Sequence, residues 1–130
     1  MFERLRAVLE ADSRLAYALL FGSSARGTTH AASDADVAVG LRDGVRLRTL
    51  DVGDLIARIE DAAGRPVHLV VLDEAPPGLA FRIFQGGQVL FSRGDRALSA
   101  RRARAILEYV DFRPIEEICA RGVLETRRGR

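Results

Sequence analysis

The chain has 130 residues, a formal net charge of +2 and 48% hydrophobic residues, which predicts a single domain over residues 1–130 with a filled core. No apolar run approaches the roughly 20 residues that span a bilayer, and no signal-peptide pattern precedes the first predicted helix, so we expect a cytoplasmic protein with no membrane partner. The single cysteine, Cys119, excludes an internal disulfide and a cysteine-rich metal site.

The first half of the chain contains two predicted helices and two predicted strands. Apolar residues at helical spacing predict an amphipathic helix over 2–11, and the run LAYALLF predicts a buried strand over 15–21. Residues 34–41 alternate in a way that predicts a second strand. Residues 50–63 carry an apolar stripe at helical spacing, and the glycine and proline that follow predict the end of that helix.

The second half continues the alternation of strands and helices. The run VHLVVL predicts a strand over 67–72, and QVLFS predicts another over 88–92. Between them, the segment PPGLAFRIFQGG begins with prolines that suit a helix start and ends in a glycine pair. The remainder is predicted to be helical, with an interruption at Pro114. Strands separated by helices predict an α/β or α+β fold, with the helices packed on a sheet.

Two short motifs point to a ligand site. Gly22-Ser23 follows the first predicted strand, and ten residues later Asp34 and Asp36 share one face of the next strand, with Cβ atoms roughly 6–7 Å apart. Mg²⁺ in proteins typically takes one or two carboxylates together with substrate phosphates. A Gly-Ser turn that leads into a helix offers backbone N–H groups to phosphate. Together these parts predict a site for a nucleoside triphosphate bound through a metal.

The same residues also have a purely structural interpretation. A Gly-Ser turn on the surface and a strand with a polar face occur in many proteins without any ligand. The two motifs together are more specific than either alone. Here they occur in a fixed order: an apolar strand, Gly-Ser, ten residues, Asp-x-Asp and a second apolar strand.

Gly22-Ser23 and Asp34-Ala35-Asp36 resemble the signature of the DNA-polymerase-β-like nucleotidyltransferases. More closely, the sequence resembles the minimal nucleotidyltransferases, or MNT proteins, which act as antitoxins beside HEPN-domain ribonuclease toxins. The segments GRPVHLVVLDEAPPGLAFRIFQGGQVLF and RARAILEYVDFRPIEEICARGVLE resemble the later strands and C-terminal helices of that family. The resemblance implies an α+β fold, close to α/β. It would have a small mixed nucleotidyltransferase sheet with packed helices over about 14–92 and a C-terminal helical segment over about 95–127.

The resemblance also implies roles for particular residues. Gly22 and Ser23 would hold the β- and γ-phosphates of ATP, and Asp34 and Asp36 would hold Mg²⁺ or Mn²⁺. Members of the family transfer AMP from ATP to a tyrosine hydroxyl of the HEPN toxin, which silences the ribonuclease. The chemistry is an in-line displacement assisted by metal ions. We therefore expect ATP as substrate and a HEPN toxin as partner in a hetero-oligomer.

Two further residues would make secondary contacts in this comparison. Arg26 and Ser33 would touch the phosphates or the nucleotide. His30, in the loop between the two motifs, is expected to be solvated.

One residue departs from the family pattern. The family usually places a third acid on the strand after the helix, and here that strand reads Val-His-Leu-Val, so that His68 occupies the position of the acid. Imidazole removes one negative charge and suits Zn²⁺, Mn²⁺ or Fe²⁺ better than Mg²⁺. His68 can be a working base or ligand, can mark a site that binds nucleotide but transfers poorly, or can simply fill the strand face. Asp73 and Glu74 lie roughly 16–20 Å further along the chain at strand spacing, too far to replace the acid.

Three function classes therefore remain open. The first is an ATP-dependent protein adenylyltransferase, and the second is an antitoxin that neutralises its partner by binding, with a weak or inactive nucleotide site. The third, transfer to nucleic acid or to a small molecule, usually requires a further substrate-binding domain. All twenty basic residues are arginines, and their short clusters at 101–104 and 127–130 are typical of solvated surfaces, so we expect no direct nucleic-acid binding. Modification of Tyr17 or Tyr109 in the same chain also remains open.

Overall fold

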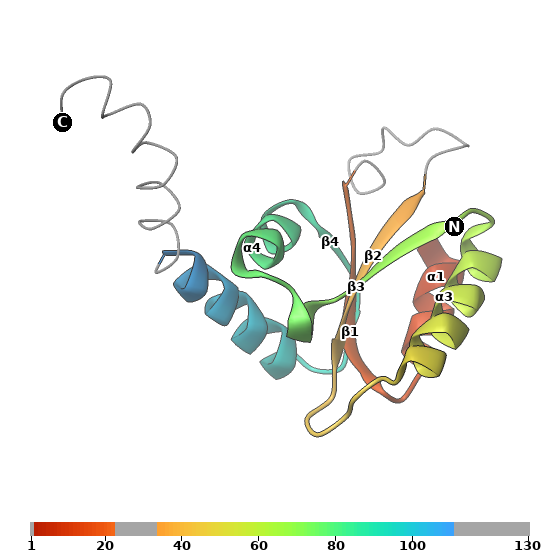
Figure 1. Ribbon diagram of the computed structural model, residues 1–130, viewed down its shortest axis with the longest axis horizontal. Helices are drawn as coiled ribbons and strands as arrows, with labels where there is room; N and C mark the ends of the chain where they lie inside the picture. Colours follow the sequence, from red (N-terminus) through yellow and green to blue (C-terminus); the bar gives the residue numbers. More distant parts are fainter. Residues whose placement is uncertain (1, 23–33, 111–130) are drawn as a thin grey trace, which may run out of the picture.

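A four-stranded mixed sheet forms the centre of the computed structural model, which describes residues 2–22 and 34–110 (Figure 1). The strands are β1 (Leu15–Phe21), β2 (Ala35–Leu41), β3 (Val67–Val71) and β4 (Gln88–Ser92), in the spatial order β3-β2-β1-β4. β1 pairs antiparallel with both β2 and β4, and β2 pairs parallel with β3. The expected α+β class with a small mixed sheet is confirmed.

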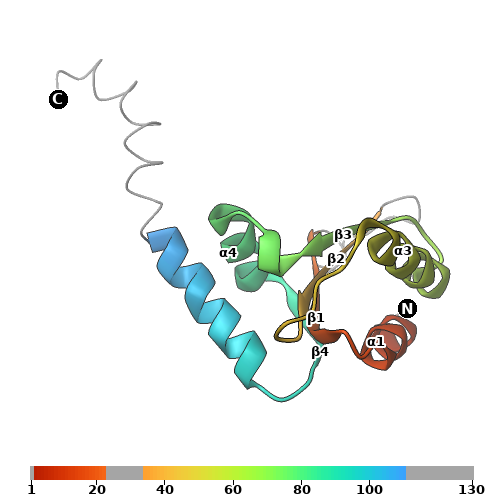
Figure 2. The same cartoon turned by 60° about the horizontal axis from the view of Figure 1, so that its bottom comes forward.

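Helices cover both faces of this sheet (Figures 1 and 2). On one face lie α1 (Phe2–Ala11) and α3 (Thr49–Ala63), and on the other lie α4 (Pro77–Gly86) and a helix over 96–110. A short 3₁₀ helix, η1 (Leu72–Glu74), joins β3 to the loop before α4. The sheet is therefore the middle of three layers, and the two central strands, β1 and β2, bury side chains on both faces.

Alternation along the two central strands divides the core into two clusters. Towards α1 and α3, Val37 and Val39 of β2 pack with Leu55 of α3 and with other buried aliphatic residues. Towards α4, Ala38 packs with Tyr17 and with the apolar side of that helix. Because β2 has an apolar row on each side, its polar residues are confined to the end of the strand near Asp36.

The observed bounds lie close to the predicted ones, with small corrections at the ends. The strand expected over 34–41 begins at Ala35, and the strand expected over 67–72 ends at Val71, because Leu72 turns into η1 and is buried there. The helix after β4 covers 96–110, and the helical segment expected after Pro114 lies outside the described residues. None of the helices in the described ranges is long and apolar enough to cross a lipid bilayer.

Candidate nucleotide site

The end of β1 meets the beginning of β2 at a glycine. Phe21 is the register partner of Asp36, and Gly22 follows with a φ of 69°, a conformation that favours glycine. A Cβ added to Gly22 would lie 2.3 Å from Oδ2 of Asp36. A side chain at position 22 would therefore have to displace the Asp36 carboxylate, in addition to adopting a strained positive φ.

His68 lies beside the same carboxylate on the neighbouring strand. In the parallel pairing of β2 with β3, Asp36 is the register partner of His68, and the imidazole Nδ1 lies 3.4 Å from Asp36 Oδ1. The His68 side chain is 65% exposed and that of Asp36 is 25% exposed. The residue in the position of the family's third acid thus stands next to Asp36, on the edge strand and open to solvent.

The other predicted site residues are distributed differently. Asp34 is exposed and precedes β2 by one residue. Ser23, Arg26 and Ser33, together with His30, lie outside the described residues. The structure thus brings together Gly22, Asp36 and His68 from the predicted set.

Asp73 does not contribute a further acid to this site. Its carboxylate Oδ1 accepts a hydrogen bond of 3.0 Å from the backbone N–H of Leu41, at the opposite end of β2 from Asp36. The expectation that no neighbouring acid replaces the residue at position 68 agrees with this placement.

The side chains of Asp34, Asp36 and His68 suit a divalent cation that binds together with a nucleotide. Over residues 2–22 and 34–110, no group of three or more His, Cys, Asp or Glu side chains converges as a ready-made metal site. Asp36 and the exposed Asp34 offer carboxylate oxygen, the ligand type that Mg²⁺ prefers, and His68 adds a nitrogen beside Asp36. Phosphate oxygens of a bound nucleotide would have to complete the coordination.

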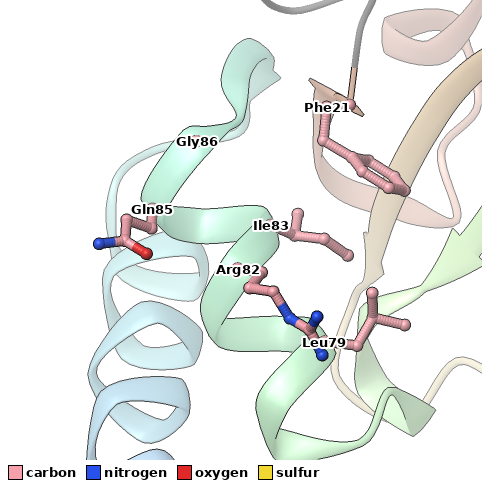
Figure 3. Close-up of a pocket in the computed structure, with 7 residues that line it drawn as sticks. Phe21, Leu79, Arg82, Ile83, Gln85 and Gly86 are labelled. Carbon is pink, nitrogen blue, oxygen red and sulfur yellow. The ribbon is translucent and has the colours of Figure 1, made fainter.

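A cavity of about 550 Å³ opens directly beside Gly22. It lies between the end of β1 and helix α4, and Figure 3 shows Leu79, Arg82 and Ile83 on the side of α4 that faces Phe21, with Gln85 directed away. Its walls are mostly apolar, and among the described residues Arg82 is the one charged side chain that lines it. Arg82 is absent from the residues predicted from the sequence, although an isolated arginine within the apolar segment GLAFRIF was a signal that could have singled it out.

Neither described tyrosine is presented as an acceptor in the cavity. Tyr17 is only 3% exposed, and burial raises the pKa of its phenol. Tyr109 stacks on Phe81 with ring centroids 4.1 Å apart, which joins the 96–110 helix to α4. The hydroxyl of Tyr17 is therefore shielded from any nucleotide as long as the sheet is folded.

Comparison with known proteins identifies the fold. A toxin–antitoxin complex with AMP-PNP contains a chain that is 23% identical, with a TM-score of 0.81 over 95% of this chain and 98% of that one. A complex of a tri-AMPylated Shewanella oneidensis HEPN toxin with an MNT antitoxin contains a chain that is 19% identical, with a TM-score of 0.74 over 95% of this chain and 99% of that one. A candidate minimal nucleotidyltransferase is 30% identical, with a TM-score of 0.55 over 65% and 87%.

No curated protein matched the sequence. The family model described as "Polymerase beta, Nucleotidyltransferase" matches residues 3–96, which include both central strands, β3 and α4. The chain therefore belongs to the polymerase β nucleotidyltransferase family.

Proposed function

We propose that this protein is an antitoxin that binds ATP with Mg²⁺ or Mn²⁺ at the end of β1 and β2 and transfers AMP to a tyrosine of a HEPN toxin. The observation that carries the proposal is the meeting of Gly22, Asp36 and His68 on one end of the sheet. Family membership supports nucleotidyl transfer as the reaction class. The fold shared with chains of toxin–antitoxin complexes supports the partner.

The reaction would be an in-line displacement at the α-phosphorus, with the nucleotide held by side chains of this site. The acceptor oxygen attacks the α-phosphorus, the bond from that phosphorus to the bridging oxygen of the β-phosphate breaks, and pyrophosphate leaves with its charge on the phosphates. A divalent cation held by Asp34 and Asp36 would neutralise the triphosphate and would stabilise the departing pyrophosphate. Asp36 and Asp34 would hold the nucleotide through that cation, while the missing side chain at Gly22, which lines the cavity, would let phosphate approach the backbone.

His68 would receive the proton of the acceptor hydroxyl. Its Nδ1 faces Oδ1 of Asp36 at 3.4 Å, so a proton on Nδ1 would point to that carboxylate and leave Nε2 as the acceptor. A neutral imidazole in this orientation is a general base, as in other hydrolytic and transfer sites where a carboxylate fixes the tautomer. The exposed side chain on the edge strand β3 is accessible to a residue from a partner protein.

A second candidate function is neutralisation by binding alone. It is favoured by one observation, namely that the position of the third acid carries an imidazole, which reduces the negative charge available to a second cation. In that case the nucleotide would stabilise the antitoxin or its complex without efficient transfer.

A transfer assay separates the two candidates. The purified protein is incubated with a HEPN toxin and with ATP labelled in the adenine or α-phosphate, in Mg²⁺ or in Mn²⁺. Label on the toxin, lost when its acceptor tyrosine is changed to phenylalanine, supports the transferase. Silencing of the ribonuclease without label supports neutralisation by binding.

The metal-dependent nucleotide site has its own test. We expect Asp34→Asn and Asp36→Asn each to abolish Mg²⁺-dependent binding of a non-hydrolysable ATP analogue in calorimetry, because each removes one of the two carboxylates available to the cation. Asp61→Asn is the matched control, since Asp61 is exposed on α3 at the other face of the sheet. Retained Mg²⁺-dependent affinity in both site variants would contradict the proposed site.

A further inference from the structure

The cavity beside Gly22 has a defined position relative to the reacting atoms of the proposed transfer. Its lining residues come from the end of β1 and from α4, and none comes from β2 or β3. Across the sheet the order is therefore His68 on β3, Asp36 on β2, Gly22 after β1, and then the cavity. The base and the cavity lie on opposite sides of the carboxylate that would hold the nucleotide.

In an in-line displacement the acceptor and the leaving group stand on opposite sides of the phosphorus. If His68 marks the side of the acceptor, the leaving pyrophosphate lies on the side of Gly22. The cavity then adjoins the terminal phosphates rather than the acceptor. This step rests on the proposed function described above.

Arg82 is available to a phosphate in that cavity. Its Nε donates one hydrogen bond of 3.2 Å to the backbone carbonyl of Gly78, and among the described residues the side chain has no ion pair and no other hydrogen bond. The side chain is exposed, and it is the only charged residue of α4. Figure 3 shows the guanidinium beside Leu79, on the side of the helix that lines the cavity.

The apolar surroundings strengthen an arginine–phosphate contact. Phe21, Leu79 and Ile83 form the neighbouring walls, so a phosphate that enters is shielded from water on that side while the exposed guanidinium of Arg82 reaches it. Guanidinium presents a fork of N–H donors that matches phosphate oxygens in pairs. A substrate with four negative charges beside two aspartates also requires more positive charge than one divalent cation supplies.

We infer that Arg82 binds the β- and γ-phosphates of the nucleotide, and then the departing pyrophosphate, in the cavity between β1 and α4. Arg82 thereby selects nucleoside triphosphates over monophosphates. It is a binding residue for the part of the substrate that leaves, and it takes no part in proton transfer.

Calorimetry on the full chain with three ligands tests this assignment. We expect Arg82→Gln to weaken the non-hydrolysable ATP analogue and inorganic pyrophosphate about tenfold or more, because charge-assisted hydrogen bonds are lost. The affinity for AMP, which lacks the terminal phosphates, should change by less than about twofold. Arg82→Lys should recover part of the lost affinity, since it restores the charge without the fork.

Arg4→Gln is the matched control, because Arg4 is an exposed arginine on α1 at the other face of the sheet, and it should leave all three affinities unchanged. Equal affinity of Arg82→Gln and the unchanged protein for the analogue would overturn the inference. So would an equal loss for AMP, which would place the nucleoside in the cavity. Binding of no nucleotide by the unchanged protein would instead contradict the proposed function itself, and the inference with it.

Discussion

His68 sets the charge of the proposed catalytic site. Its imidazole Nδ1 lies 3.4 Å from Asp36 Oδ1, where an aspartate would bring a third carboxylate to the same end of the sheet. A carboxylate at this position could bind a cation through oxygen and accept a proton, whereas neutral imidazole accepts a proton without adding negative charge. The two side chains therefore differ mainly in how well they hold Mg²⁺.

For this reason we expect His68→Asp to increase the rate of AMP transfer in Mg²⁺ about tenfold or more, which corresponds to about 1.4 kcal/mol of activation free energy. His68→Gln, which keeps a polar side chain but removes the base, should lower the rate. Initial rates of label transfer to the toxin measure both effects. Unchanged rates in a folded His68→Asp variant would contradict the idea that a carboxylate at position 68 improves the Mg²⁺ site.

Pairing of β1 with β2 depends on a fit between a large and a small residue. Gly40 is the register partner of Tyr17, and a Cβ added to Gly40 would lie 1.9 Å from Cζ of the tyrosine ring. The ring thus lies over the backbone of the neighbouring strand and contributes to the cluster beneath α4. Glycine within a strand, which usually weakens it, is here needed for close packing.

Gly40→Ala should therefore destabilise the protein by about 2 kcal/mol, because the ring or the strand must move to admit the methyl group. In a Tyr17→Ala background the same change should cost about 1 kcal/mol less, since the ring is absent. Urea unfolding of the two single variants and the double variant measures this coupling. Additive effects would show that the ring and the glycine are energetically independent.

The sequence predicts elements more reliably than it predicts contacts between them. Apolar periodicity and glycine or proline boundaries are local signals, so the strands 15–21 and 88–92 agree with the observed β1 and β4. The sequence places the end of the strand at 67–72 one residue too late. Leu72 is apolar, as a strand residue would be, but it is buried in the 3₁₀ helix that follows β3. Position 68 was singled out by the resemblance to a known family, because the alternation of apolar residues along this strand does not distinguish His68 from a surface residue.

Long-range packing was not predictable in the same way. The cavity beside Gly22 depends on where α4 crosses the end of β1, and no local pattern specifies that crossing. Likewise, Gly40 reads as an ordinary glycine near a strand end until Tyr17 is known to lie against it. Such features arise from the register of the strands and the docking of helices, which are properties of the assembled sheet.

A polar network joins the secondary-structure elements at the end of the sheet opposite the candidate site. Arg14 donates from its backbone N–H, its Nε and its Nη2 to the buried carboxylate of Asp12, and also pairs with Asp51 of α3 at 3.5 Å. Arg93, after β4, donates to the backbone carbonyls of Leu15, Glu10 and Asp12. These contacts connect α1, β1, α3 and β4 at one point.

The network makes the stability of the whole molecule depend on pH. The side-chain hydrogen bond from Arg14 holds the pKa of Asp12 below its usual value. A carboxyl whose pKa is lowered on folding stabilises the protein above its unfolded pKa of about 3.9, and that contribution is lost as the pH falls through the lowered folded pKa.

We accordingly expect Asp12→Asn to lower the free energy of unfolding by about 2 kcal/mol at pH 7, with the difference from the unchanged protein disappearing towards pH 2. Urea unfolding at a series of pH values measures this. Asp61→Asn, an exposed change on α3, should alter stability by no more than about 0.5 kcal/mol at pH 7. A difference that stays constant down to pH 2 would show that the charge of Asp12 is not the cause.

Because His68 is exposed on the edge strand β3, a substitution there can change the rate of the proposed transfer without changing the stability of the fold. The side chain is 65% exposed and belongs to neither buried cluster, so changing it leaves the packed layers intact. In the proposed role, one substitution there would alter how quickly a toxin is modified, while the amount of folded antitoxin in the cell stayed the same. The dose needed to silence a given quantity of toxin could thus be adjusted at a single position.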